Sequence, residues 1–552
     1  MQSTPQQLIK KYTDNGWWGN NTLHDLVQKA VKQSPNHTAL IDPPNREQLD
    51  GNVPVSWTFA ELDHQADLLG ARLYELGLRQ GDIVMLQLPN VAEIVVAYLT
   101  AARMGLIVSP IAMQYGRHEL KQFCDVVAPR GYIASETFQG AEFASAQASA
   151  LPSDCLCIPY GKANENDASL KTFKSYQASL TLDANDIYTI CWTSGTTGRS
   201  KGVPRSHNHW MSSTIASEDA IKLNQHAVML NPFPFVNMAS IGGFLYYWLN
   251  IQGTLVLHHP FDVHVYLSQL QDNKVEYTIA PPAVLTRLMQ ISEQIKSNYD
   301  LTAVRSIASG SAPLSPTMIS GFKDEFGIDI VNIFGSNEGM AILSSAIDVP
   351  DPQERAWFFP RFGRTEFDWD NRIAQRIETK LVDPVTGIEV TEPGTPGECL
   401  IKGVTVFDGY YQSDDDNRQA FSQDGYFKSG DLFEIAGPDN QYYKFVGRCK
   451  SLIVRGGINI SPEELDELIA SHPSVTEAAV ASYPDEVLGE RICAYVVLAE
   501  GESMQLADLT AYLNERSVAK FKWPEHLEIL DALPRNAMNK VVRTELNWKP
   551  SD

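Results

Sequence analysis

Apolar residues recur along the chain in two spacings, one typical of helices and one typical of strands. Helical spacing occurs within residues 8–40, again from Trp57 to Leu76, and again from Val91 to Met104. Short apolar runs at Ile83–Leu88 and Gly105–Pro110 have the length of buried strands. Because helices alternate with buried strands, the pattern predicts an α/β sheet domain.

The pattern changes further along the chain. Residues 136–182 are rich in Ala, Ser, Asn and Asp with little periodicity, which predicts a surface connection. Turn signals become frequent after Gly363 and predict a strand-rich region. A chain of 552 residues exceeds what one core usually organises. We therefore predict an α/β fold with two or more domains, in which α/β sheets are joined by a small β-rich part.

Composition excludes several classes of protein. The apolar fraction is 43% and the charged fraction 20%, as in ordinary globular proteins. The formal net charge of −23 argues against nucleic acid as a partner. No apolar run is long enough to predict a membrane span, and the first residues lack the pattern of a secretory signal. Seven scattered cysteines predict reduced thiols and a cytoplasmic location.

A loop with the composition of an anion site follows the apolar run Ile187–Trp192. Its sequence is TSGTTGRSKG, from Thr193 to Gly202. Glycines allow the backbone to approach a ligand closely, and successive N–H groups in such a loop bind anions. The spacing differs from a Walker A motif, and an ordinary Ser/Thr/Gly loop would have a similar composition. We predict that phosphate is bound by Thr193, Ser194, Gly195, Thr196, Thr197, Gly198 and Lys201.

The order S-G-T-T-G-x-x-K-G resembles the phosphate loop of the adenylate-forming superfamily, which contains acyl- and aryl-CoA synthetases, luciferases and adenylation domains. Further strings resemble motifs of the same superfamily, in the same order along nearly the whole chain. These strings are Ser309–Leu314, Asn332–Gly339, Asp424–Asp431, Gly447–Ile453 and Leu533–Arg543.

The resemblance implies a nucleotide site. It implies that Phe334 stacks on adenine and that Glu338 ligates the Mg²⁺ held by ATP, a role that suits a carboxylate. Asp431 would accept hydrogen bonds from the ribose hydroxyls, and Arg448 would contact ribose or phosphate oxygens. Asn337 replaces the usual threonine. Other residues implied to lie along the nucleotide are Ser311, Ala312 and Gly335.

The resemblance also locates an acid-binding pocket, with one departure. The superfamily commonly has a histidine three residues after a proline in this region. Here that position is Asn237 when counted from Pro234, or Phe235 when counted from Pro232, so the histidine is missing. The apolar and aromatic segment Ile241–Leu249 favours an apolar or ring-bearing acid. The predicted pocket residues are Phe235, Asn237, Gly310, Gly335 and Gly339.

The C-terminal strings imply a large N-terminal domain of several subdomains, residues 1–450, and a small, mobile α+β C-terminal domain, residues 451–552. Ser451 occupies the hinge position, where Asp or Lys is usual, and a small residue there can absorb a change of φ and ψ. Lys540 matches the catalytic lysine, although Asn539 replaces the glycine before it. The strand near Gly456 and Gly457 is expected to form a tunnel for pantetheine.

Together these motifs predict an ATP-dependent carboxylic acid:CoA ligase that uses Mg²⁺, with CoA as co-substrate. An aryl-acid AMP ligase that loads a carrier protein, as in siderophore synthesis, is the alternative. Residues Asp14–Trp18 and Thr22–Leu26 resemble the start of such enzymes. A luciferase-like oxygenase and a non-catalytic nucleotide sensor are more distant hypotheses. The sequence leaves the oligomeric state open, with a homodimer as one option.

Overall fold

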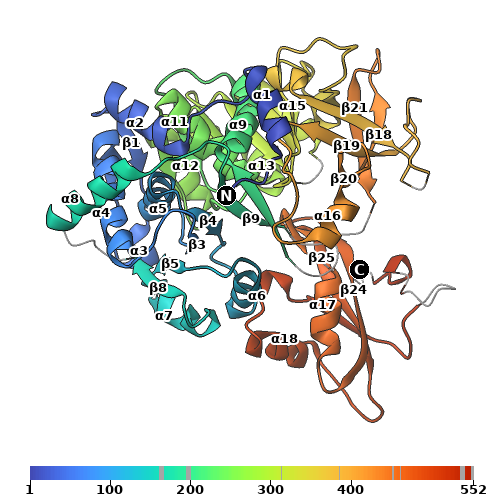
Figure 1. The fold of residues 1–552 in the computed structure, drawn as a ribbon. Helices are drawn as coiled ribbons and strands as arrows, with labels where there is room; N and C mark the ends of the chain where they lie inside the picture. Colours follow the sequence, from blue (N-terminus) through green and yellow to red (C-terminus); the bar gives the residue numbers. More distant parts are fainter. Residues whose placement is uncertain are drawn as a thin grey trace. The chain divides into compact units, whose positions relative to one another are not determined.

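The computed structural model describes residues 1–160, 167–193, 200–311, 314–384, 386–449, 453–460, 462–534, 541 and 543–548. The chain divides into two compact units (Figure 1). Unit 1 contains residues 1–113, 126–192 and 202–449, and unit 2 contains residues 114–125, 193–201 and 450–552. The sequence did not assign the two short segments, 114–125 and 193–201, to the second unit, because tertiary contacts rather than chain order decide this grouping.

The largest sheet has eight strands in the order β16-β15-β14-β13-β11-β12-β1-β2. The inner neighbours run parallel, and each edge is closed by an antiparallel pair. Parallel strands need crossover connections, which the intervening helices supply. The strands are β1 (Thr38–Ile41), β2 (Ser56–Thr58), β11 (Val228–Asn231), β12 (Thr254–Leu257), β13 (Tyr277–Ile279), β14 (Ser306–Gly310), β15 (Asp329–Gly335) and β16 (Ala341–Ser344).

The second sheet has six strands in the order β10-β9-β4-β3-β5-β8. Its central strand β3 is buried at every position, as expected for a parallel strand covered on both faces. The strands are β3 (Ile83–Gln87), β4 (Ile107–Pro110), β5 (Gly131–Ser135), β8 (Leu156–Tyr160), β9 (Ile187–Thr193) and β10 (Lys201–Ser206). The predicted α/β class is confirmed.

A third, antiparallel sheet forms the β-rich part of unit 1. Its order is β17-β21-β20-β19-β18, and a two-stranded ribbon, β6 (Thr137–Phe138) with β7 (Ala141–Glu142), lies elsewhere in the unit. The predicted strand-rich region after Gly363 is confirmed. The strands are β17 (Phe358–Pro360), β18 (Ile377–Val382), β19 (Gly397–Gly403), β20 (Phe427–Ala436) and β21 (Tyr442–Arg448).

Local chemistry fixes where several helices begin. Helix α4 begins at Phe59 because the Thr58 hydroxyl accepts from the N–H of Glu61, while the Glu61 carboxylate accepts from the N–H of Thr58. The helices before residue 450 are α1 (Gln6–Asp14), α2 (Leu23–Gln33), α3 (Arg46–Asp50), α4 (Phe59–Glu75), α5 (Ala92–Met104), α6 (Arg117–Val127), α7 (Ala144–Gln147), α8 (Asp167–Ser179), α9 (His207–Ile221), α10 (Met238–Ser240), α11 (Tyr247–Ile251), α12 (Val263–Asp272), α13 (Pro282–Gln290), α14 (Ser292–Asn298), α15 (Pro316–Phe326) and α16 (Asp414–Ala420). Shorter helical turns are η1 (Ala148–Ala150), η3 (Glu354–Ala356), η4 (Arg372–Gln375) and the π-helix η2 (Ile241–Tyr246).

The prediction that residues 136–182 form only a surface connection is wrong. Instead of a bare surface connection, this stretch contains the edge strand β8, which pairs in parallel with β5, and the helix α8, which packs on α4. Strand β8 includes Pro159, and edge strands tolerate proline because one side of the strand needs no donor. The short, irregular hydrophobic pattern of this stretch therefore hid a regular element.

Unit 2 has its own sheet and core. Its strands follow the order β23-β22-β25-β24, with β26 parallel to β25. Helices α17 and α18 cover a core that includes Leu465, Ile492 and Leu509. The elements after residue 450 are β22 (Ile453–Arg455), β23 (Ile458–Ile460), α17 (Pro462–Ala470), β24 (Val475–Asp485), β25 (Gly489–Leu498), α18 (Leu506–Glu515), η5 (Lys520–Lys522), β26 (His526–Ile529) and η6 (Arg543–Glu545).

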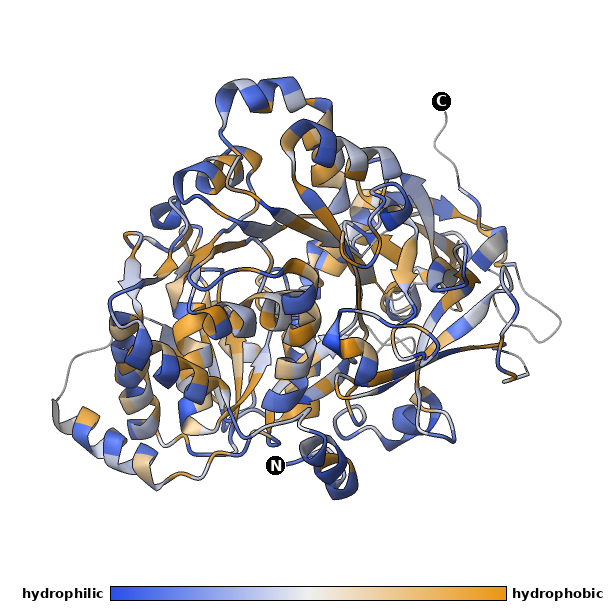
Figure 2. Ribbon diagram, turned by 90° about the horizontal axis from the view of Figure 1, so that it is seen from above, coloured by the Kyte–Doolittle hydropathy of each residue, from blue (hydrophilic) through white to orange (hydrophobic). Residues whose placement is uncertain are grey.

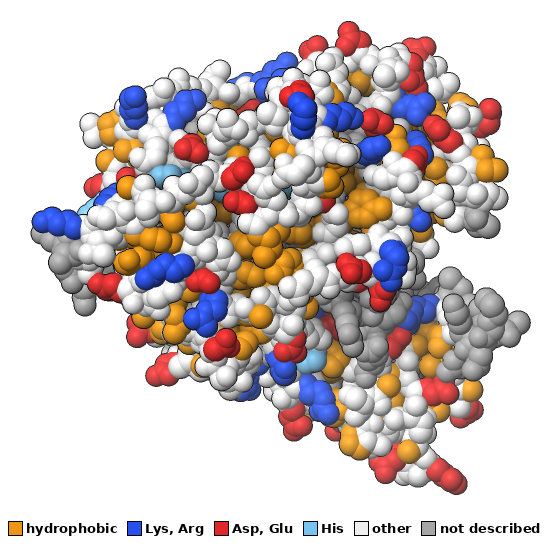
Figure 3. All heavy atoms as spheres, in the orientation of Figure 1, with side chains coloured by type: hydrophobic (Ala, Val, Ile, Leu, Met, Phe, Trp, Pro, Cys, Tyr) orange, Lys and Arg blue, Asp and Glu red, His pale blue; other side chains and the backbone are white. Residues whose placement is uncertain are grey.

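The surface and interior differ as expected for a globular protein. Hydrophobic residues concentrate along the strands and the inward turns of helices (Figure 2). On the face shown in Figure 3, acidic and basic side chains are interspersed. Within the described part of the chain, every helix is too short or too polar to reach across a lipid bilayer.

Candidate active site

The predicted magnesium ligand lies in a tight turn between β15 and β16. The N–H of Ser336 donates to the carbonyl of Met340 (3.1 Å), and the N–H of Gly339 donates to the carbonyl of Ser336 (3.1 Å). Gly339 has φ +118°, and a Cβ atom there would lie 2.2 Å from the carbonyl oxygen of Thr405. The turn therefore requires glycine and brings residues 335–339 against the segment around Thr405.

Replacing Gly339 with alanine is expected to destabilise the protein by more than about 3 kcal/mol, because the new Cβ would collide with rigid backbone at an unfavourable φ. Urea unfolding measures this cost. Gly327→Ala is the matched control, since Gly327 also has a positive φ (+71°) but open space around its Cβ, and it should cost about 1–2 kcal/mol. Equal costs for the two variants would show that the contact with Thr405 is not rigid.

Glu338 is nearly buried, with 8% of its surface exposed. The Tyr410 hydroxyl donates to its Oε1 (3.1 Å), and its backbone carbonyl accepts from the N–H of Phe407 (2.9 Å). Burial and the adjacent Glu338 carboxylate raise the pKa of Tyr410, so the phenol stays protonated and acts as a donor. The carboxylate is thus held by one neutral hydrogen-bond donor, and the buried Arg205 guanidinium also interacts with it electrostatically.

Asn337 joins three segments of unit 1. Its amide oxygen accepts from the N–H of Met238 (2.9 Å), and its amide nitrogen donates to the carbonyl of Trp192 (3.1 Å). Met238 begins α10 in the predicted acid pocket, and Trp192 precedes the predicted phosphate loop by one residue. The amide of asparagine supplies both a donor and an acceptor for these bonds.

Arg205, which the sequence did not single out, holds the turn that carries Asn337 and Glu338 by hydrogen bonds. It is fully buried, and burial lowers its pKa to about 10. It donates to the carbonyls of Asn337 (2.8 Å) and Thr405 (3.0 Å) and to the Ser213 hydroxyl (2.7 Å). Because one guanidinium binds both segments, it fixes the Glu338 turn relative to the loop that carries Tyr410.

The predicted adenine and ribose residues lie on or against the antiparallel sheet β17-β21-β20-β19-β18 of unit 1. Phe334 is half-buried, and its ring meets the Phe433 ring edge-on, with centroids 4.8 Å apart. Phe433 lies on β20 two residues beyond Asp431, and Asp431 is the register partner of Arg448 on β21. Their roles toward the nucleotide stay predictions, and of Arg448 only the strand position is described.

Residues 309–311, the described beginning of the Ser309–Leu314 string, pair with the strand that leads into the same turn. Gly310 ends β14 and is the register partner of Ile333 on β15. A Cβ atom at Gly310 would lie 2.2 Å from the Ile333 carbonyl oxygen, so the close approach requires glycine. Ser311 follows with φ +71°. This geometry explains the small residues, whereas Gly335 has more room, since its Cβ would lie 3.2 Å from the Met340 carbonyl oxygen.

The two residues considered for the missing histidine have structural contacts. The Asn237 side-chain oxygen accepts from the N–H of Ser240 (3.3 Å) and caps α10. Phe235 is 2% exposed and packs in the core beside Tyr98, whose hydroxyl donates to the Phe235 carbonyl. Substrate contact by either residue stays a prediction.

In unit 2, Gly456 and Gly457 form the two-residue turn of the β22–β23 hairpin. Both have positive φ (+57° and +80°), which this kind of turn requires. Thr193 ends β9 and Lys201 begins β10. The remaining predicted residues lie outside the described part of the chain, namely Ser194, Gly195, Thr196, Thr197, Gly198, Ala312, Ser451 and Lys540.

Magnesium fits the donor set at Glu338. Among the described residues, no group of three or more His, Cys, Asp or Glu side chains is arranged to hold a metal ion. A single buried carboxylate suits Mg²⁺, which usually takes one or two protein carboxylates and completes its shell with phosphate oxygens and water.

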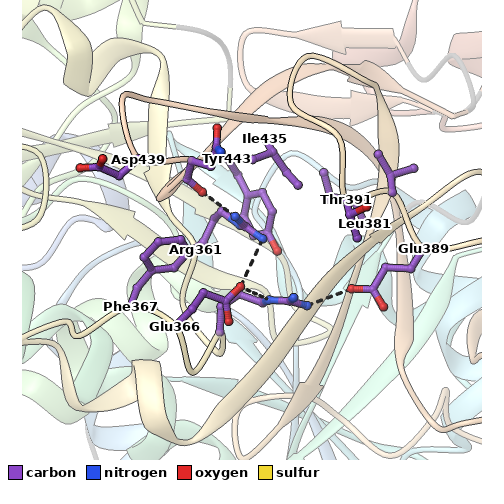
Figure 4. Close-up of a pocket in the computed structure, with 12 residues that line it drawn as sticks. Arg361, Glu366, Phe367, Leu381, Glu389, Thr391, Ile435, Asp439 and Tyr443 are labelled. Carbon is purple, nitrogen blue, oxygen red and sulfur yellow. Dashed lines mark hydrogen bonds and ion pairs between the residues drawn. The ribbon is translucent and has the colours of Figure 1, made fainter.

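A cavity of about 400 Å³ lies elsewhere in unit 1, in the β-rich part (Figure 4). Its polar side chains already pair with one another, because Arg364 bonds Glu366 (3.1 Å) and Glu389 (2.9 Å). Arg361 bonds the carbonyl of Asn440 and lies near Glu366. None of the predicted site residues lines this cavity, so it is not the nucleotide site that the motifs predict.

The site residues that sequence reasoning missed are Arg205, Asp408 and Tyr410. Arg205 lies three residues beyond the predicted phosphate loop, whereas Asp408 and Tyr410 lie before the Asp424–Asp431 string, and the sequence carries no signal for their partners. The bond from Tyr410 to Glu338 spans 72 residues and the bond from Arg205 to Thr405 spans 200.

Comparisons with known proteins bear on the family and the fold of this chain. The family model described as AMP-binding enzyme matches residues 27–411, and the model described as AMP-binding enzyme C-terminal domain matches residues 464–540. The chain is 28% identical to a medium-chain fatty-acid–CoA ligase of Escherichia coli, over 98% of this chain and 92% of the relative. It is 26% identical to a 2,3-dihydroxybenzoate-AMP ligase of Bacillus subtilis, over 98% and 96% of the two chains. The fold resembles o-succinylbenzoate CoA synthetase from Bacillus subtilis, with TM-score 0.76, 22% identity, and coverage of 96% and 98%.

Proposed function

Because the chain belongs to the AMP-binding enzyme family, we propose that it is an ATP-dependent carboxylic acid:CoA ligase acting on an apolar or ring-bearing acid. The chain is an adenylate-forming acid ligase, and its relatives include acyl-CoA and aryl-acid ligases. The observation that carries the proposal is the Asn337 junction. It fastens the turn bearing Glu338 to the end of β9 and to the start of α10.

In the first half-reaction, an oxygen of the acid's carboxylate attacks the α-phosphorus of ATP, and pyrophosphate leaves. The protein's task is to bring two anions together, since carboxylate and triphosphate repel each other in water. In this proposal Lys540 bridges the acid and the α-phosphate, while the 193–202 loop holds the outer phosphates. When bound at Glu338, Mg²⁺ would neutralise phosphate charge.

In the second half-reaction, a thiol attacks the acyl carbon of the mixed anhydride, and AMP leaves. The small domain would turn about Ser451, so that Lys540 withdraws and the hairpin at Gly456 and Gly457 lines the path of pantetheine. The thiol proton passes to solvent or to AMP, so that thioester and AMP are the products. One site thereby serves both steps.

The acid pocket is proposed to extend to Gly243 in the π-helix η2. This residue is buried, yet among the described residues no atom outside its own turn of helix and its two chain neighbours lies within 4 Å of where its Cβ would be. Its neighbour Gly242 is in ordinary packing contact, with Met238 and Ser213 at 3.4 Å from the corresponding position. A π-helix at such a place is typical of functional sites. The free space beside Gly243 suits an acid larger than acetate.

Gly243→Leu is expected to raise KM about tenfold or more for medium-chain or ring-bearing acids and to leave KM for short acids unchanged. The added side chain would take the space that about two methylene groups of a larger acid occupy. Pyrophosphate release measured across an acid series tests this effect. Gly242→Ala is the control, because it adds bulk in the same helix away from the space. A uniform change across all acids would remove Gly243 from the pocket.

The thiol acceptor separates the main proposal from its alternative. Several relatives are aryl-acid AMP ligases, and one is named a salicyl-S-ArCP synthetase, which favours a carrier-protein acceptor as the second candidate. Thioester formation with free CoA, compared with a phosphopantetheinylated carrier protein, tests the choice. Turnover with CoA at a comparable or higher kcat/KM supports the proposal, and strict dependence on the carrier contradicts it. The cytoplasmic location and the oligomeric state stay predictions.

A further inference from the structure

The first contact of interest joins Tyr410 to Glu338. Glu338 is the proposed metal ligand, and the Tyr410 hydroxyl is the side-chain donor that holds its Oε1. A carboxylate on a turn can rotate unless a second group fixes it, so the position of Tyr410 determines where the other carboxylate oxygen points.

Tyr410 is itself held by its backbone. The Asn417 side chain accepts from the Tyr410 N–H (2.6 Å) and donates to the Tyr410 carbonyl (3.1 Å). Gly409, the preceding residue, has φ +140°, and a Cβ there would lie 3.0 Å from Asn417. The loop is therefore set in one conformation on both sides of Tyr410.

Asp408 anchors the same loop in the interior. Its side chain is 12% exposed, and burial raises its pKa to about 6. The Thr4 hydroxyl donates to its Oδ2, and His209 Nε2 lies 3.6 Å from the same oxygen. Burial keeps the pKa of His209 well below its usual range, so the ring is neutral and does not form a full ion pair. Thr4, which is 4% exposed, is thus the closest donor to a desolvated carboxylate.

The residues before Thr4 are bound as well. Gln2 forms a β-bridge with Asp186, and its side-chain amide donates to Asp183 (2.9 Å). The carbonyl of Met1 accepts from the N–H of Ile187, the first residue of β9 (2.7 Å). Residues 1–4 therefore lie on the start of β9 and end on Asp408.

We propose that residues 1–4 form an N-terminal strap that positions Glu338 through Thr4, Asp408 and Tyr410. The strap and Tyr410 act as positioning residues and do not touch the reacting atoms. The inference rests on the proposed function only for the role of Glu338 toward magnesium. Its consequence is that the magnesium-dependent part of ATP binding depends on a hydroxyl at position 4.

The experiment measures ATP binding by titration calorimetry, with Mg²⁺ and then with EDTA, for the full chain and its variants. Tyr410→Phe and Thr4→Val should each reduce the gain in affinity due to Mg²⁺ by about fivefold to tenfold, the scale of the net contribution of one hydrogen bond. Binding of metal-free ATP should stay unchanged. The double variant should lose no more than the worse single variant, because both act along one path.

Three controls distinguish positioning from packing. Tyr426→Phe removes another tyrosine–glutamate bond, to Glu378 (2.9 Å), and Thr13→Val alters an exposed threonine of α1, so neither should change the magnesium gain. Thr4→Ser restores the hydroxyl and should recover it. Thermal melting confirms that each variant is folded.

The proposal is overturned if the variants weaken ATP binding equally with and without Mg²⁺, if Thr4→Val behaves like Thr13→Val, or if the two losses add. It is also overturned if the unaltered protein gains nothing from Mg²⁺. The proposed function is judged separately, by whether the unaltered protein activates an acid with ATP.

Discussion

Replacing Lys540 with alanine is expected to slow acid-dependent adenylation about 10²–10³-fold, the usual effect of removing one preorganised charge from a transition state. Acidic residues outnumber basic residues in this chain, whose formal net charge is −23. The variant should still convert a supplied acyl-adenylate and thiol to the thioester, because in the proposed second half-reaction Lys540 has withdrawn from the site. Pyrophosphate release and thioester formation measure the two halves separately.

Lys520→Ala is the matched control for this prediction. Lys520 is an exposed lysine of the same small domain, and its removal should leave both half-reactions within about twofold. Equal loss of both half-reactions in Lys540→Ala would contradict a role confined to adenylation.

Glu338→Gln is expected to lower kcat/KM for ATP at least about 10²-fold, because the amide keeps the shape of the side chain and loses its charge toward magnesium. Stability should change little, since the amide oxygen can still accept from Tyr410. Excess Mg²⁺ should recover part of the activity. Steady-state kinetics at several magnesium concentrations, together with urea unfolding, measure both effects.

The control is Glu378→Gln, which changes an exposed carboxylate that also bonds a tyrosine, Tyr426. It should leave kcat/KM unchanged. Activity of Glu338→Gln close to that of the unaltered protein would mean that Glu338 serves only the turn.

The alternation of helices and strands can be predicted from the sequence because long segments, such as Phe59–Glu75 and Ala92–Met104, keep a helical spacing of apolar residues throughout. Strand β8 could not be predicted from the sequence. It is short, contains Pro159, and buries only one of its five residues well, so neither alternation nor a long apolar run marks it. Its place at the sheet edge follows from pairing with β5, which is a tertiary choice.

The sequence likewise predicted some of the candidate site residues and missed others. Motif resemblance singled out Glu338 and Asn337, and the role of Glu338 toward magnesium stays a prediction. The resemblance could not locate Arg205, Thr4 or Asp408, because their roles arise from burial and from contacts distant in sequence, such as Arg205 with Thr405 and Thr4 with Asp408. The structure also explains Asn337, which departs from the family pattern, by its two bonds to separate segments.

The central claim is that acid and AMP become joined through an oxygen of the acid. Incubating the protein with ATP, thiol and an acid labelled with ¹⁸O in its carboxylate tests it most directly, with the nucleotide analysed by mass spectrometry. The account predicts AMP that carries one ¹⁸O atom and pyrophosphate that carries none. Label in inorganic phosphate with ADP as the other product, or unlabelled AMP, would contradict it.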